Sequence, residues 1–136
     1  MKDAFHRYVV DGERSAERVD GTRFIAYAAP FESMEQLKAY AKDLRGALGD
    51  GVIALALEAD EPQLFVTVSD DLVRRGLSAG QLVQAGAPIM DGKGGGRPEM
   101  AQARGARRDR VPSALEAIRQ AVSASLDDGS AEATPG

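Results

Sequence analysis

The feature that most limits the fold of this chain is an uninterrupted apolar run at residues 52–57 that closely follows a helix with both ends marked. A strand without polar positions must be covered on both faces, so helices are expected on both sides of a sheet. The helix is predicted to begin after Ser33, which forms a capping box with Gln36, and to end at Gly49. This pattern indicates an α/β fold.

Another apolar run, residues 24–29, precedes the helix and ends at Pro30. The order strand, helix, strand predicts parallel pairing through a right-handed crossover. The five-residue connection 58–62 is short enough for a hairpin, so the strand at 63–69 is expected to run antiparallel. The sequence therefore predicts a single domain in which helices pack on a small mixed β-sheet.

Further helices are marked by serine caps and by proline. A short helical turn, DLVRR, is expected at 71–75, bracketed by Asp70, Asp71 and Gly76. A helix is expected to open at Ser78 and to stop near Ala87, because Pro88 removes a backbone donor. Ser113 is expected to cap a last helix. Its inward stripe is expected to be Leu115, Ile118, Val122 and Leu126.

The 136 residues are predicted to form three parts. Residues 1–19 are a weakly patterned extension, 20–126 the domain, and 127–136 a polar tail expected to be disordered. The chain has no cysteine, a single histidine (His6) and no membrane-length apolar run. No nucleophile has a partnered base. We therefore expect a cytoplasmic chain with no metal site, no cofactor, no membrane association and no catalytic residue of its own.

The stretch 92–108, GKGGGRPEMAQARGARR, is a cationic island in a chain of net charge −4. Residues 91–110 carry six basic and three acidic side chains, which gives a local charge of +3. Lys93 precedes the glycines and no Ser or Thr follows them, so the P-loop motif is absent. On composition alone this stretch is a flexible surface loop.

Two segments carry more information. VSDDLVRRGLSAGQLV and GKGGGRPEMAQARG closely resemble the C-terminal, DHHA1-type domain of alanyl-tRNA synthetases, a superfamily also attached to DHH-type phosphoesterases. The resemblance covers residues 20–122, about three quarters of the chain. In the phosphoesterase relatives a histidine typically follows the glycines. Arg97 at that position points to the synthetase branch.

The resemblance implies a non-catalytic module that contacts the tRNA elbow and helps to link aminoacylation to editing in an ATP-dependent ligase. Its implied partners are tRNA and the catalytic and editing regions of the synthetase. Backbone N–H groups of glycines can approach phosphates, arginine can pair bidentately with phosphate or stack on a base, and Gln102 can bond a base edge or a 2′-hydroxyl. The candidate RNA-binding residues are Lys93, Gly94, Gly95, Gly96, Arg97, Gln102, Arg104, Arg107 and Arg108.

Two other functions stay open. One is a nucleotide-binding accessory domain of a DHH-type phosphoesterase, and the other is a dimerisation module. Asp70 and Asp71 resemble a carboxylate pair for metal or acid–base chemistry, but their place before a short helix favours charges at the helix N-terminus. Arg74 and Arg75 are either part of an RNA face or solvated surface. Tyr40 is expected to point inward from its helix.

Overall fold

The computed structural model describes residues 17–19 and 22–133, and these residues form one six-stranded mixed sheet in the order β1-β2-β3-β4-β6-β5. Among the neighbouring pairs, β2–β3 is parallel and the rest are antiparallel. The parallel β2–β3 pair and the antiparallel β3–β4 hairpin confirm the predicted topology. The strands are β1 (Glu17–Val19), β2 (Thr22–Ala29), β3 (Val52–Leu57), β4 (Gln63–Val68), β5 (Lys93–Gly96) and β6 (Met100–Arg104).

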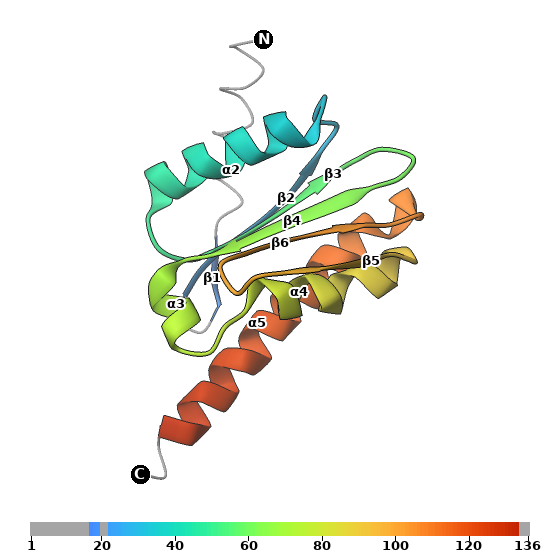
Figure 1. The fold of residues 1–136 in the computed structure, drawn as a ribbon. Helices are drawn as coiled ribbons and strands as arrows, with labels where there is room; N and C mark the ends of the chain where they lie inside the picture. The colour runs from blue at the N-terminus through green and yellow to red at the C-terminus, as the bar shows by residue number, and fades with distance from the viewer. Residues whose placement is uncertain (1–16, 20–21, 134–136) are drawn as a thin grey trace.

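Helices cover both faces of this sheet (Figure 1). α2 (Met34–Leu48) lies on one face, whereas α4 (Ala79–Gly86) and α5 (Val111–Ala133) lie on the other. The predicted α/β fold class is therefore confirmed. The shorter helical segments are α3 (Asp70–Arg74), η1 (Ala87–Met90) and η2 (Arg108–Arg110).

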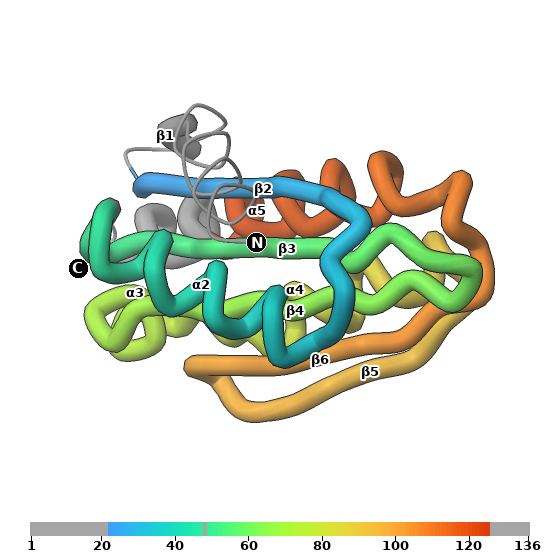
Figure 2. Tube along the Cα trace, turned by 90° about the horizontal axis from the view of Figure 1, so that it is seen from above, coloured from blue at the N-terminus to red at the C-terminus, as the bar shows by residue number. Residues whose placement is uncertain are grey.

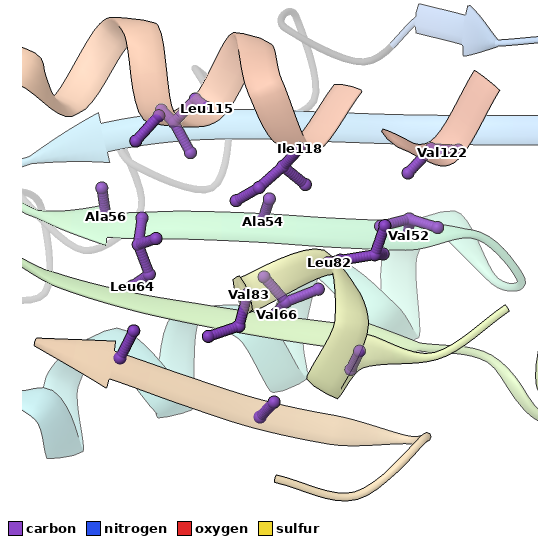
Figure 3. Close-up of a cluster of buried hydrophobic side chains, with 14 of the residues drawn as sticks. Val52, Ala54, Ala56, Leu64, Val66, Leu82, Val83, Leu115, Ile118 and Val122 are labelled. Atoms are coloured by element: carbon purple, nitrogen blue, oxygen red, sulfur yellow. The ribbon is translucent and has the colours of Figure 1, made fainter. Parts of the chain in front are cut away.

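Strand β3 is the centre of two hydrophobic cores, because its side chains alternate between the two faces. All of its six residues are buried, as the apolar run predicted. One core, between the sheet and α4 and α5, is shown in Figure 3 and includes Val52, Ala54, Ala56, Val66, Leu82, Val83 and Ile118. The other, beneath α2, includes Ile53, Leu55, Leu57, Phe65, Leu37, Tyr40 and Leu44.

The ends of α2 lie where the sequence predicted them, but the Gln36 side chain bonds the residue before the cap and not Ser33 itself. Ser33 Oγ accepts a hydrogen bond from Gln36 N at 3.2 Å, and Gln36 Oε1 accepts one from Glu32 N at 2.7 Å. Gly49 ends the helix at φ 76°, a conformation that favours glycine. Tyr40 is fully buried in the α2 core, as expected. These local signals place α2 where the sequence predicted it.

Other predicted ends are corrected by the structure. α5 begins at Val111, so Ser113 lies inside its first turn and does not cap it. Pro112 suits that first turn because its missing N–H has no helical partner there. The helix also continues through Ala133, so most of the segment expected as a disordered tail is helical. At the other end, β1 brings Glu17–Val19 into the sheet from the predicted extension, while His6 lies outside the described residues.

Candidate nucleic-acid interface

The glycine-rich stretch forms a β-hairpin at the edge of the sheet, which corrects the expectation of a flexible loop. Strands β5 and β6 pair antiparallel, and Arg97 N donates to Met100 O at 2.9 Å next to the turn. The hairpin is also held by α4, whose first residue, Ala79, donates its N–H to Pro98 O at 2.8 Å. Residues 93–104 are called here the edge hairpin. Backbone hydrogen bonds tie them to strand β4 on one side and to the start of α4.

Two of its glycines have a packing reason for lacking a side chain. A Cβ on Gly94 would lie 2.5 Å from Ala103 Cα, and a Cβ on Gly96 would lie 2.7 Å from Ala101 Cα. A Cβ on Gly95 would instead find only Gln84 Nε2 within contact distance, at 3.7 Å. Gly94 and Gly96 thus permit the close approach of β5 to β6, whereas Gly95 has room beside its Cα.

The side chains of β6 alternate between the core and solvent. Ala101 and Ala103 are buried, whereas Met100, Gln102 and Arg104 are exposed. Gln102 lies opposite Gly95 on one side and Phe65 on the other, and Arg104 lies opposite Lys93. The hairpin therefore brings together two predicted cations, Lys93 and Arg104, with Gln102 close to them along β6.

Arg97 lies at the tip of the edge hairpin. Its side chain is 77% exposed and its Nε is 3.3 Å from Glu99 Oε1. A single exposed ion pair of this kind contributes little, about 0–1 kcal/mol, so it does not hold the guanidinium away from a ligand. Arg97 is thus a cation that an incoming phosphate can reach.

Arg107 and Arg108 follow the hairpin and lie among carboxylates. Arg107 binds Asp109 bidentately, with Nε–Oδ1 at 3.1 Å and Nη2–Oδ2 at 3.0 Å, and its Nη1 is 3.8 Å from Asp91. The hydrogen bonds to Asp109 raise the pKa of Arg107 and lower the pKa of Asp109. Arg108 lines a hollow that also contains Glu58, Asp60 and Asp109. Bound carboxylates therefore offset the charge of Arg107, whereas Arg108 shares its hollow with acids.

A groove that the sequence analysis missed lies beside the edge hairpin. Figure 2 shows α2 above the middle of the sheet, with β6 and β5 extending beyond it. The step between them is a groove of about 590 Å³. We call it the α2 groove, defined by Lys38, Lys42 and Arg45 on α2 and by Phe65, Thr67 and Met100 on β4 and β6.

The sequence did contain a signal for one wall of this groove. Lys38, Lys42 and Arg45 recur at i, i+4 and i+7, the spacing of residues on one helix face. Arg45 also has a structural role, because its guanidinium donates to Gly49 O and Gly51 O at 2.9 Å and to Thr67 Oγ1 at 2.7 Å. Burial lowers the pKa of Arg45.

The acidic pair after β4 lies at the N-terminus of a short helix, as the sequence predicted. Asp70 and Asp71 form the first turn of α3. Asp71 Oδ1 accepts a hydrogen bond from Ser69 Oγ at 2.7 Å, and this bond lowers the pKa of Asp71. Among the side chains that the structure describes, no three His, Cys, Asp or Glu residues gather as a metal site. Arg74 and Arg75 are exposed on α3 and at its end.

The mixed sheet, the two helical layers and the glycine-rich edge hairpin define a small α/β module. A family model described as the DHHA1 domain matches residues 21–124. The chain belongs to the DHHA1 domain family. No helix that the structure describes is long and apolar enough to cross a membrane.

Similar proteins are alanine–tRNA ligases. The chain is 42% identical over 106 residues to the ligase of Geobacillus thermodenitrificans, covering 77% of this chain and 12% of that protein. It is 41% identical over 103 residues to the ligase of Pediococcus pentosaceus, covering 75% of this chain and 12% of the ligase. The chain thus spans about an eighth of the length of these relatives.

Solved structures share the fold. The C-Ala domain of Aquifex aeolicus alanyl-tRNA synthetase superposes with a TM-score of 0.71 at 23% identity, covering 79% of this chain and 97% of that domain. RecJ from Thermus thermophilus superposes with a TM-score of 0.65 at 13% identity, covering 90% of this chain and 18% of RecJ. The predicted resemblance to the C-terminal domain of alanyl-tRNA synthetase is confirmed.

Proposed function

We propose that this chain is a non-catalytic tRNA-binding module that contacts the tRNA elbow and supports aminoacylation and editing. The observation that carries the proposal is the edge hairpin, which places Lys93, Arg97, Gln102 and Arg104 on an exposed sheet edge in a relative of alanine–tRNA ligases. Its partners are tRNA and the catalytic and editing regions of an alanyl-tRNA synthetase.

Each group on the hairpin has a distinct use in binding RNA. Lys93, Arg97 and Arg104 supply positive charge to phosphates, and arginine can bind two phosphate oxygens at once. Gln102 donates and accepts hydrogen bonds, which suits a base edge or a 2′-hydroxyl. Gly95 has no side chain and leaves space for the RNA backbone to approach strand β5. Arg107 contributes less because Asp109 already binds its guanidinium, and Arg108 contributes less because acids share the hollow that it lines.

Fluorescence anisotropy with labelled tRNA tests the proposal. Few cations act on a chain of net charge −4, so binding is expected in the micromolar range and to weaken with salt. Arg97→Ala and Lys93→Ala should each lower the affinity and flatten the plot of log affinity against log salt by about 0.9 for a duplex contact. Folding should be unchanged because both side chains are exposed.

The matched control is Arg119→Ala. It removes a charge from α5, which covers the face of the sheet opposite α2. It should leave tRNA affinity unchanged. An elbow mimic made of joined D and T hairpins should compete with tRNA, and an unrelated hairpin should compete poorly. Equal competition by the unrelated hairpin would leave only generic attraction to a polyanion, and unaltered binding by Arg97→Ala would remove the hairpin from the interface.

A further inference from the structure

The α2 groove has a floor of carbon atoms that no described residue covers fully. Met100 is 42% exposed, more than any other large hydrophobic side chain among the described residues, and it lies opposite Thr67 on β4. The groove's volume of about 590 Å³ falls within the range of small-molecule sites, roughly 300–1,000 Å³. The groove is thus large enough for a nucleotide, and methionine adapts readily to a flat partner.

One wall of the groove carries cations that are available to a ligand. Lys38 and Lys42 are exposed on α2, and neither makes an ion pair with a described residue. The ammonium of Lys38 lies 5.7 Å from the centroid of the Phe65 ring, at the floor of the groove. Arg45 is different, since its donors already bind two carbonyls and Thr67. The two lysines therefore supply the free positive charge.

The end of the groove near α3 carries acids. Asp50, Asp70 and Glu99 line it, and Glu99 is also the partner of Arg97 at the tip of the edge hairpin. Carboxylates accept hydrogen bonds from the amino groups of bases and from ribose hydroxyls. The groove thus joins an apolar floor, a cationic wall and an acceptor end.

This combination selects among possible occupants. A free phosphate would satisfy Lys38 and Lys42 and leave Met100 without a contact. An apolar helix of another protein would cover Met100 but would desolvate the carboxylates without pairing them, which is costly. A nucleotide has a flat apolar face, N–H and O–H donors and a phosphate, so it matches all three parts.

We propose that the α2 groove receives one unstacked nucleotide of the bound RNA, with the base on Met100 and the phosphate at Lys38 and Lys42. The proposal rests on the RNA-binding function above and names a second contact for it. Met100 and Gln102 share the exposed face of β6. An RNA strand held on the edge hairpin therefore runs directly into the groove.

The test uses a labelled single-stranded RNA of about eight nucleotides and the same strand without bases. Stacking on one base is expected to give the intact strand a preference of about five- to tenfold. Met100→Ala should remove this preference and leave the binding of the baseless strand unchanged. Met100→Leu, which keeps an apolar floor, should retain most of it. Thermal melting should show that both variants fold like the parent, because Met100 lies at the surface and belongs to neither hydrophobic core.

Lys38→Ala and Lys42→Ala should weaken the binding of both the intact and the baseless RNA. Each should also flatten the plot of log affinity against log salt by about 0.7 per lost single-strand contact. Arg119→Ala again serves as the control. If the parent binds tRNA through Arg97 but prefers neither strand, or if Met100→Ala changes nothing, the groove proposal is wrong and the hairpin interface stands. If the parent binds no RNA at all, both proposals fail.

Discussion

Ser69 and Gly51 exchange two hydrogen bonds between the segment that leaves β4 and the segment that enters β3. Gly51 N donates to Ser69 Oγ at 2.9 Å, and Ser69 N donates to Gly51 O at 3.1 Å. Ser69 Oγ donates onward to Asp71 Oδ1 at the start of α3. One buried serine therefore fixes the end of the α2 groove, where Asp50 and Asp70 stand.

The first prediction is that Ser69→Ala lowers the free energy of unfolding by about 1–3 kcal/mol. The physical reason is that the N–H of Gly51 loses its acceptor in a buried position. Ser33→Ala, which removes a solvent-exposed helix cap, should cost only about 1 kcal/mol and serves as the control. Urea unfolding measures both. Unfolding of Ser69→Ala at the urea concentration of the parent would contradict this role.

The second prediction concerns pH and Asp71. The hydrogen bond from Ser69 lowers the pKa of Asp71 in the folded chain, while the unfolded value is about 3.9. The carboxylate therefore contributes stability that is present above about pH 4 and is lost as pH falls through the lower folded pKa. Asp71→Asn should remove this contribution. The stability difference between parent and variant should be constant above about pH 5 and shrink below pH 4. A difference that does not change with pH would exclude the effect.

The third prediction contrasts neighbouring glycines of the edge hairpin. Gly94→Ala should destabilise the chain by about 1–3 kcal/mol, because its methyl group would collide with Ala103 on β6. Gly95→Ala should be nearly neutral, because the nearest atom is the end of the flexible Gln84 side chain at 3.7 Å. Thermal unfolding of both variants measures the contrast. Equal melting temperatures would mean that β5 shifts easily, and the packing argument would fail.

The β2–α2–β3–β4 region was predictable because its signals are local. The capping box at Ser33, Gly49 at the helix end and the short 58–62 connection each determine their own neighbourhood. Strand β5 was not predictable in this way. Glycine has no side chain, so Gly94–Gly96 show no alternation of apolar and polar residues, and the strand forms through pairing with β6. The start of α5 was missed because a serine that can cap a helix need not do so.

The candidate site likewise has one part that local sequence signals predicted and one part that depends on long-range pairing. The cations of the edge hairpin were visible as a local charge excess around Lys93 and Arg97. The α2 groove was not, although the basic spacing from Lys38 to Arg45 was present. Whether that face of α2 borders open sheet depends on the pairing of β6 with β4, which joins segments far apart in the chain. Only the three-dimensional structure brings Met100 beside this helix.

The fourth prediction is that Arg45 is a structural residue. Arg45→Met should lower the free energy of unfolding by about 1–3 kcal/mol, because Gly51 O and Thr67 Oγ1 lose a charged donor in a partly buried position. Arg45→Lys should recover only part of this loss, since an ammonium cannot reproduce the planar fork. Lys42→Met, an exposed position on the same helix, is the control. Equal stability of Arg45→Met and Lys42→Met would show that the three hydrogen bonds are dispensable.

The last prediction concerns the carboxylate that holds Arg107. Asp109 binds this guanidinium through two hydrogen bonds, so the charge of Arg107 is offset before RNA arrives. Asp109→Asn keeps the size of the side chain and removes its charge, which should free Arg107 for a phosphate. We expect tRNA affinity to rise and the plot of log affinity against log salt to steepen by up to about 0.9, the value for one duplex phosphate.

Arg107→Gln alone should flatten the same plot less than Arg97→Ala does, because Arg97 is more exposed, at 77% against 45%. Fluorescence anisotropy across a salt series measures all three variants. If Asp109→Asn leaves both affinity and salt dependence unchanged, Arg107 lies outside the RNA path, and the interface is confined to the edge hairpin and the surfaces beside it.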